Sequence, residues 1–167
     1  AAAVSVPLAI LLGLVAMRHR NGYVDRLISG TTLTAISLPE FFIGYVLIYV
    51  FPLKLGWFPV KGYQRIADGF WGFLQRLILP SVTLSVIYIA LIARITRTSV
   101  LEVMNEDYIR TARAKGQTEG KVLIRHALAN AAVPIVTVIG LGVALLIGGV
   151  VVTESVYTIP GLGRLTV

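Results

Sequence analysis

The sequence reads Asn105-Glu106-Asp107-Tyr108-Ile109-Arg110-Thr111-Ala112-Arg113-Ala114-Lys115-Gly116 between two long apolar blocks, at about residues 77–93 and 133–153. Asn105 is a favourable N-cap residue, because its side-chain oxygen can accept from the free N–H groups of a first helical turn. Acidic residues follow it at the positive end of the helix dipole, and basic residues lie toward the negative end. Gly116 can adopt the left-handed conformation that ends a helix. The stretch therefore predicts a short helix with both ends specified.

Two further apolar blocks precede this stretch, at about residues 1–17 and 33–55. Hydrophobic residues make up 56% of the 167 residues and charged residues only 14%, whereas a soluble domain is about a quarter charged. The mean hydropathy is +0.83. Apolar blocks of this length are expected to cross a bilayer as helices. The sequence thus predicts an all-α integral membrane protein with about four transmembrane helices.

The chain opens inside an apolar block and does not begin with Met. We therefore expect a fragment of a longer subunit, truncated at both ends, in which residues 1–167 form one transmembrane domain. No basic segment precedes the first apolar block, so a cleavable signal peptide is not expected.

Four spans place the loops at 18–32 and 94–132 on the same side of the membrane. These two loops hold ten of the fifteen basic residues: Arg18, Arg20, Arg26, Arg94, Arg97, Arg110, Arg113, Lys115, Lys121 and Arg125. The positive-inside bias puts such loops in the cytoplasm and puts the aromatic-rich stretch after the second block outside. The same bias explains the net charge of +7 better than nucleic-acid binding does, because the basic residues lie between apolar blocks.

The cytoplasmic loop at 94–132 contains a second start signal for a helix, Thr118 followed by Glu119, from which a helix can continue toward the fourth apolar block. A helix of about three turns has little stability alone. Strong end signals on such an element suggest that it is held rigidly as a docking helix for a cytoplasmic partner. The alternative is an ordinary solvated loop helix, and the residues alone leave both interpretations open.

Three segments carry a resemblance to a known family. The first is Glu106 to Gly116 together with Val122-Leu123-Ile124-Arg125-His126-Ala127-Leu128-Ala129-Asn130-Ala131 and Pro134, which resembles the EAA loop of binding-protein-dependent ABC importer permeases. Leu55-Gly56-Trp57-Phe58-Pro59-Val60-Lys61-Gly62 and Glu154-Ser155-Val156-Tyr157-Thr158-Ile159-Pro160-Gly161-Leu162-Gly163-Arg164 resemble flanking segments of the dipeptide/oligopeptide/nickel subfamily. The resemblance covers nearly the whole chain.

The loop departs from the general EAA pattern at several positions. Arg110 stands at the position of the glutamate, Thr111 at that of the first alanine, His126 at that of the isoleucine and Ala129 at that of the proline, whereas Ala112, Gly116 and Leu128 match. A salt bridge of the missing glutamate therefore cannot be carried over to this chain.

The resemblance implies the helical bundle of type I ABC importer permeases, in the bacterial inner membrane, as a four-span part of a six-span subunit. It also implies the partners: a second permease subunit, two cytoplasmic ATP-binding subunits, and a periplasmic or extracellular substrate-binding protein, besides membrane lipid. The transported substrate would be di- or oligopeptides, with nickel or another small solute as the alternative. The chain would be no enzyme, since ATP would be hydrolysed on a partner subunit.

The resemblance further implies an ATPase-docking set formed by Tyr108, Ile109, Arg110, Ala112, Arg113, Lys115 and Gly116. Arg110, Arg113 and Lys115 would face acidic groups or carbonyls of the ATPase. Tyr108 and Ile109 would supply the apolar anchor of the contact.

Catalytic residues, metal ligands and cofactors are not expected in this chain. It has no cysteine, and His19 and His126 lie in charged stretches without a second ligand at metal-site spacing. The segment from Gly116 to Val122 resembles a phosphate-binding loop, but it has three residues between its glycines instead of four, and Val122 stands where Ser or Thr would bind magnesium.

Within the spans, Gly140, Ala144 and Gly148 form a stripe of small residues. Such a stripe allows close packing of helices in lipid, and it could instead line the substrate pathway or contact the second permease. Glu40 lies inside the second apolar block, where a carboxylate is costly unless it faces protein or water. It could cap the break caused by Pro39, the interpretation that we favour, or contact substrate.

Two functions of other classes remain open from the residues. One is an ion-coupled transporter or channel without an ATPase, which would need ionisable relays within the membrane, where Glu40 alone is a poor candidate. The other is a membrane scaffold that transports nothing.

Overall fold

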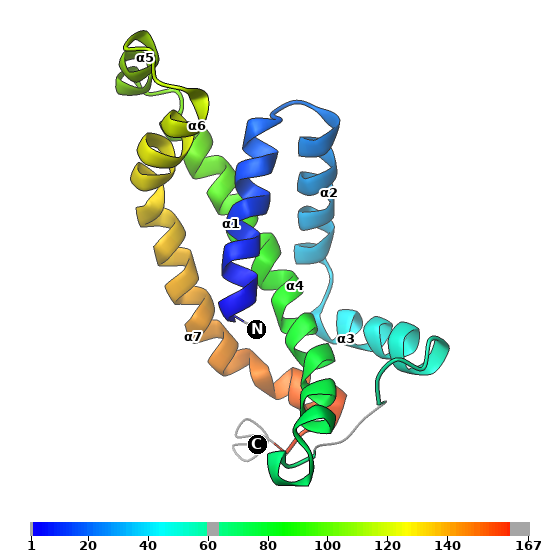
Figure 1. Ribbon diagram of the computed structural model, residues 1–167. Helices are drawn as coiled ribbons and strands as arrows, with labels where there is room; N and C mark the ends of the chain where they lie inside the picture. Colours follow the sequence, from blue (N-terminus) through cyan, green and yellow to red (C-terminus); the bar gives the residue numbers. More distant parts are fainter. Residues whose placement is uncertain (1, 60–63, 161–167) are drawn as a thin grey trace.

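The computed structural model describes residues 2–59 and 64–160, and every regular element in these two ranges is helical (Figure 1). The first helix matches the first apolar block. In chain order the elements are α1 Ala2–Arg18, α2 Tyr23–Ser37, α3 Glu40–Ile48, the π-helical turn η1 Tyr49–Lys54, the 3-10 turn η2 Ile66–Asp68, α4 Phe70–Val103, α5 Asp107–Ala114, α6 Glu119–Lys121, the π-helical segment η3 Val122–Leu128 and α7 Ala132–Tyr157.

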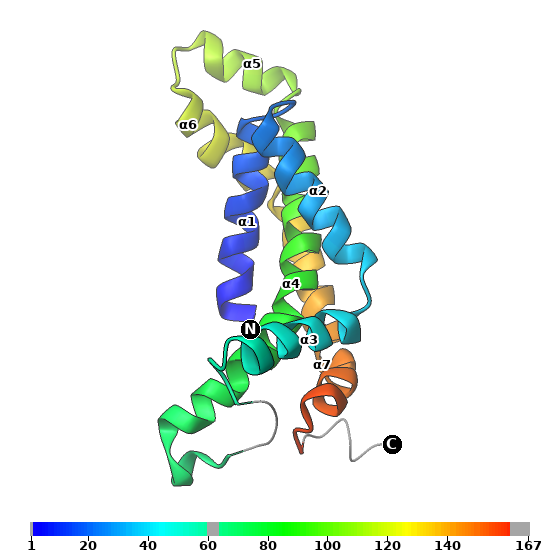
Figure 2. The ribbon, with the colours of Figure 1, turned by 90° about the vertical axis from the view of Figure 1, so that its right-hand side faces the viewer.

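Helix α4 is the centre of the bundle, and α1, α2, α3 and α7 all pack against it (Figures 1 and 2). Ala9 of α1 and Ile92 and Ala93 of α4 are buried together in this interface. The two helices approach closely at Gly13, where an added Cβ would lie 2.6 Å from Thr96 Cβ and 2.7 Å from Ala93 O. A small residue is therefore required at position 13.

The turn between α1 and α2 lies at the same end of the bundle as α5 and α6, while η2 and the last turns of α7 lie at the opposite end (Figures 1 and 2). This places the two strongly basic segments at one end, as an alternating path through a membrane requires. Their assignment to the cytoplasm stays a prediction.

The helices around the second predicted span, 33–55, do not share its bounds. Helix α2 already begins at Tyr23, so most of the predicted loop at 18–32 is helical, and the path then bends by 103° between α2 and the segment Glu40–Lys54. The cause is Pro39, because the residue before a proline avoids the α conformation. Leu38 is accordingly extended, with φ −87° and ψ 134°.

The predicted third span, 77–93, lies within a longer helix. Helix α4 extends from Phe70 to Val103 over 34 residues, so the connection predicted at 94–132 begins only at Met104. The extension keeps an apolar face, since Val100 is fully buried. Helix α7, Ala132–Tyr157, contains the predicted fourth span and continues one turn beyond it.

Length and composition alone qualify one helix in the described parts of the chain, α4, as membrane-spanning. The number rises to three if each of two bent pairs counts as one span: Tyr23–Ser37 with Glu40–Lys54, and Glu119–Leu128 with Ala132–Ala144, which are bent by 58°. Helix α1 is apolar but has only 17 residues.

Candidate functional site

The candidate site is the docking segment, Met104 to Ala131, which connects α4 to α7 at the basic end of the bundle (Figure 1). Helix α5 spans Asp107–Ala114, eight residues, and α6 leads directly into η3 and then toward α7. Gly116 turns the chain between α5 and α6 with a φ of +77°, a conformation that non-glycine residues rarely adopt. The predicted helix stop at Gly116 is confirmed.

The predicted N-cap at Asn105 is wrong. Its side-chain Nδ2 donates back to the carbonyl oxygen of Leu101 at 3.1 Å, within the last turn of α4. Glu106 occupies the N-cap position with extended dihedral angles, and its carbonyl accepts from the N–H of Ile109 at 3.1 Å. Because α4 continues ten residues beyond its predicted end, Asn105 belongs to the C-terminal end of that helix.

The inner face of α5 is part of the bundle's largest apolar cluster. Ile109 and Ala112 are 0% and 7% exposed. They pack with residues from three other elements, namely Met17 of α1, Val100 of α4, and Val122, Leu123 and Ala127 of η3. The cluster continues to Ala131 and to Ile135 in α7. The docking segment is therefore anchored to α1, α4 and α7 at once.

The outer face of α5 presents Tyr108, 43% exposed, and the exposed side chains of Arg110 and Lys115. The Arg110 guanidinium lies 3.4 Å from the carboxylate of Asp107, one turn earlier, and both side chains remain largely in solvent. Cationic and aromatic groups thus lie exposed on the sides of α5 that the described part of the chain leaves uncovered.

Arg113 has an internal partner. Its Nε donates to Glu119 Oε1 at 2.8 Å and its Nη2 to Glu119 Oε2 at 3.2 Å, which joins α5 to α6 across the turn at Gly116. Arg113 lowers the pKa of the Glu119 carboxyl, first through these hydrogen bonds and then through its charge. The pair is therefore ionised at neutral pH and fixes the geometry of the segment.

These positions divide the predicted docking set. Tyr108, Arg110 and Lys115 are exposed as a contact surface requires, whereas Ile109 is wrongly predicted as a partner-facing anchor because its side chain is fully enclosed by the protein's own core. Ala112 faces the same core, and Gly116 shapes the turn. Arg113 pairs with Glu119 and remains 39% exposed, and its expected contact with the ATPase stays a prediction.

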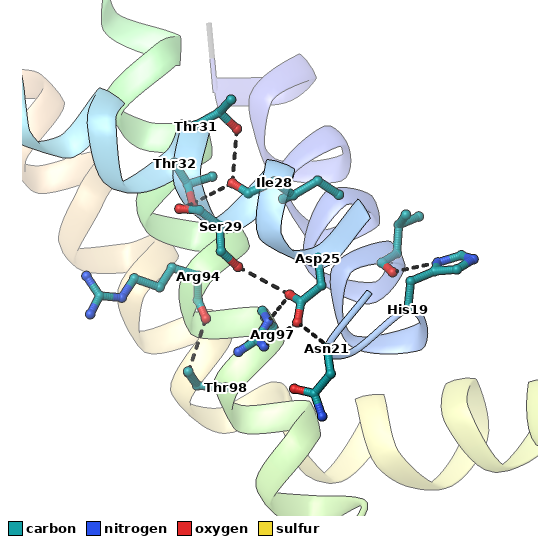
Figure 3. Close-up of polar contacts among 11 residues, drawn as sticks. His19, Asn21, Asp25, Ile28, Ser29, Thr31, Thr32, Arg94, Arg97 and Thr98 are labelled. Atoms are coloured by element: carbon teal, nitrogen blue, oxygen red, sulfur yellow. Dashed lines mark hydrogen bonds and ion pairs between the residues drawn. The ribbon is translucent and has the colours of Figure 1, made fainter. Parts of the chain in front are cut away.

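A second arrangement, at Asp25 and Arg97, supports the same end of the bundle (Figure 3). Arg97 of α4 donates from Nε and Nη2 to the two carboxylate oxygens of Asp25 in α2, at 2.6 and 2.7 Å. The Asn21 backbone N–H and the Ser29 hydroxyl also donate to this carboxylate, at 3.0 and 3.2 Å. The Asp25 side chain is only 6% exposed.

This ion pair fixes the first turn of α2 to α4, two turns before α4 enters the docking segment. Sequence reasoning missed it, because Asp25 was placed in a solvated loop and Arg97 was counted only as a basic residue of the cytoplasmic side. The one available signal was an acid within an otherwise basic stretch, Arg18 to Arg26, and it does not identify a partner 72 residues away.

The span residues singled out from the sequence lie at two different places. Glu40 opens α3 directly after the break at Pro39 and accepts a hydrogen bond from the Thr153 hydroxyl of α7, so it joins α3 to α7. Gly140 and Ala144 are exposed on α7, and the side-chain surroundings of Gly148 lie outside the described parts.

Close packing against α7 occurs instead at Gly142, where an added Cβ would overlap the Tyr88 ring. The Tyr88 hydroxyl donates to the carbonyl oxygen of Ile139 at 2.7 Å, which holds the ring in this position.

The two histidines have local polar partners. His19 Nδ1 lies 3.0 Å from the carbonyl oxygen of Val15, and His126 Nε2 lies 2.7 Å from Gln117 Oε1. Among the residues that the structure describes, no group of three or more His, Cys, Asp or Glu residues could hold a metal ion.

Comparison with known proteins agrees with these features. Residues 5–167 match the family described as binding-protein-dependent transport system inner membrane component. A probable peptide ABC transporter permease of Sinorhizobium fredii is 52% identical over 98% of this chain and 52% of its own length. The glutathione transport system permease of Escherichia coli K12 is 46% identical over 93% of this chain and 48% of its own length.

The chain thus spans about half the length of these relatives. The match confirms the fold class expected from the sequence, an all-α membrane domain of the type I ABC importer permease fold. The family consists of membrane permeases and not of enzymes. This chain belongs to the family of inner membrane components of binding-protein-dependent transport systems.

Proposed function

We propose that this chain forms part of the permease subunit of an ATP-binding-cassette importer for di- or oligopeptides, and that its docking segment contacts a separate ATPase. The observation that carries the proposal is the two-sided construction of α5. Its inner side chains, Ile109 and Ala112, are buried in a cluster shared with α1 and α4, while Tyr108, Arg110 and the C-cap residue Lys115 are exposed away from that cluster.

This construction suits the transmission of a force. An eight-residue helix is unstable alone, but here it is fixed to the bundle by apolar packing and by the Arg113–Glu119 ion pair. A displacement of the outer surface then moves α1, α4 and η3 together, because packed interiors are close to rigid. Nucleotide-driven closure of two ATPase subunits would bias one arrangement of the spans over another.

The remaining partners follow from the family and from the names of the relatives. Binding-protein-dependent transport implies an external substrate-binding protein and a cytoplasmic source of ATP hydrolysis. The exposed small residues Gly140 and Ala144 suit contact with a second permease or with further spans of the subunit. The relatives are named for peptide and glutathione transport, which favours a peptide-like substrate over nickel.

Uptake tests the function. The full subunit is expressed with its second permease, ATPases and binding protein in a strain deleted for the system, and uptake of a labelled tripeptide and of radioactive nickel is measured. We expect peptide uptake that stops when the P-loop lysine of the ATPase is replaced, because this lysine holds the transferred phosphate. Uptake that continues with the disabled ATPase would support an ion-coupled transporter instead, and nickel uptake alone would overturn the peptide assignment.

A charge swap separates the internal role of Arg113 from a role in docking. Arg113→Glu places two carboxylates together across the turn, so we expect hydrolysis to uncouple from uptake. The double variant Arg113→Glu with Glu119→Arg restores the pair and should recover coupling if Arg113 acts within the segment. If the double variant stays uncoupled while its docking segment is folded, Arg113 contacts the ATPase directly. Arg125→Gln, an exposed change on η3, is the control.

A further inference from the structure

A cavity of about 390 Å³ lies between the end of α1 and the docking segment. It is lined by the consecutive residues Arg18, His19 and Arg20, by Met104 and Asn105 at the end of α4, and by Arg113 and Glu119 across the turn of the docking segment, with Met17 and Leu123 completing the wall. The lining therefore combines three guanidinium groups with a single carboxylate.

Of the three arginines that line this cavity, only Arg113 has a hydrogen-bonded carboxylate partner. Glu119 binds Arg113 through two hydrogen bonds, and the charge of Arg18 also acts on Glu119. Within residues 2–59 and 64–160, the guanidinium groups of Arg18 and Arg20 make no hydrogen bond or ion pair. His19 directs Nδ1 toward the carbonyl of Val15. Two guanidinium groups thus line the cavity without a hydrogen-bonded counter-ion, and oxyanions are the ligands that guanidinium groups bind best.

The level of the cavity relative to the membrane indicates the source of such an anion. Helix α1 is an apolar helix of 17 residues that ends at Arg18, and its length of roughly 26 Å is close to the thickness of a bilayer's hydrocarbon core. Arg18 and Arg20 therefore lie at the level at which an apolar helix emerges among lipid headgroups. Basic pockets at this level bind anionic headgroups, and Lys and Arg residues near an anionic leaflet are attracted to it.

We propose that this cavity binds the phosphate of an anionic phospholipid headgroup through Arg18 and Arg20. The bound lipid bridges the end of α1 to the docking segment and competes with Glu119 for Arg113. A zwitterionic choline headgroup fits poorly, because its quaternary ammonium would approach the same guanidinium groups. The proposal does not depend on the identity of the transported substrate or on ATPase docking.

Lipid retention tests the proposal on the full-length subunit in its assembled complex. The complex is reconstituted in phosphatidylcholine with a minor share of phosphatidylglycerol and extracted with mild detergent, and the retained lipids are quantified by mass spectrometry. We expect enrichment of phosphatidylglycerol that falls about fivefold for each arginine removed in Arg18→Gln and Arg20→Gln. Glu119→Gln should raise it by freeing Arg113, and Arg125→Gln, outside the cavity, should leave it unchanged.

Three results would overturn the lipid assignment. Equal enrichment in the double arginine variant and the unchanged protein would remove the cavity from the binding site. Displacement of the lipid by inorganic phosphate at millimolar concentration would identify a soluble anion as the ligand. Loss of ATPase co-purification in the double variant, with no change in lipid ratio, would assign the arginines to a protein partner.

Discussion

At the scale of residues, the Asp25–Arg97 ion pair is the best-defined polar contact of the bundle (Figure 3). Removing Arg97 leaves the carboxylate of Asp25, whose side chain is only 6% exposed, without its counter-charge, and such a loss typically costs about 3–5 kcal/mol. We therefore expect Arg97→Gln to lower the thermal stability of the purified complex strongly, and Asp25→Asn to lower it less, because the Arg97 side chain is 25% exposed. Arg97→Lys should be intermediate, because an ammonium group cannot bind both carboxylate oxygens in the same planar geometry.

Arg94→Gln is the matched control for this ion pair, since Arg94 lies on the same helix and is exposed. Thermal unfolding followed by the loss of monodisperse complex on heating measures the difference. Equal stability of Arg97→Gln and Arg94→Gln would show that the pair does not hold α2 to α4.

Two glycines of α7 allow a matched comparison in packing. An added Cβ at Gly142 would overlap the Tyr88 ring, whereas nothing lies within 4 Å of an added Cβ at Gly140. Gly142→Ala should lower stability by about 1–3 kcal/mol, the usual cost of overpacking. Gly140→Ala meets nothing within the described part of this chain, so in the same thermal assay a loss of stability would support contact of this face with a second permease or further spans, and a neutral result would contradict it.

At the scale of elements, helix α5 carries buried side chains that stabilise the docking segment and exposed side chains that are available for binding a partner. Ile109→Ala removes a fully buried side chain of the shared cluster, and such a change typically costs about 2–5 kcal/mol. We expect faster amide hydrogen exchange over residues 107–128 of the assembled complex in this variant. The loss of ATPase binding would then follow from loosening of α5.

Tyr108→Ala is the counterpart on the outer side of α5. It should leave hydrogen exchange in α5 unchanged and weaken ATPase binding, by about 2 kcal/mol if Tyr108 is a central aromatic anchor. The opposite pattern, with loosening by Tyr108→Ala and none by Ile109→Ala, would contradict the orientation of the helix.

The helical character of the elements could be predicted from the sequence, but several of their bounds could not. Residues 23–32 include Asp25, Arg26, Ser29 and two threonines, and a hydropathy pattern therefore predicts a polar loop. In the structure, the hydroxyls of Thr31, Thr32 and Thr34 donate to carbonyls one turn earlier in α2, and Asp25 is neutralised by Arg97. Such compensation depends on the helix itself and on a distant partner, which composition does not reveal.

In the docking segment, too, only some features could be predicted from the sequence. Gly116 was predictable because a left-handed turn favours glycine whatever surrounds it. The spacing of charges in α5 indicated a short helix, but which side of it faces the bundle depends on the positions of Met17 and Val100. The assignment of Ile109 to an external contact was therefore wrong, whereas that of Tyr108, Arg110 and Lys115 stays a prediction.

At the scale of the whole molecule, α4 connects all the features described here. It packs on α1, α2, α3 and α7, holds Asp25 through Arg97, and leads into the docking segment at Met104. The break at Leu38–Pro39 lets α3 cross the bundle near the opposite end (Figure 2). Movement of the docking segment can therefore reach both ends of the bundle through one continuous helix.

The contact between the outer face of α5 and an ATPase is the central claim, and site-specific cross-linking tests it most directly. The chain has no cysteine, so Lys115→Cys and Trp57→Cys each introduce a single reactive position in this part of the subunit, at opposite ends of the bundle. In the assembled complex we predict a cross-link from position 115 to the ATPase subunit and none from position 57. A cross-link from position 57 alone would contradict the account.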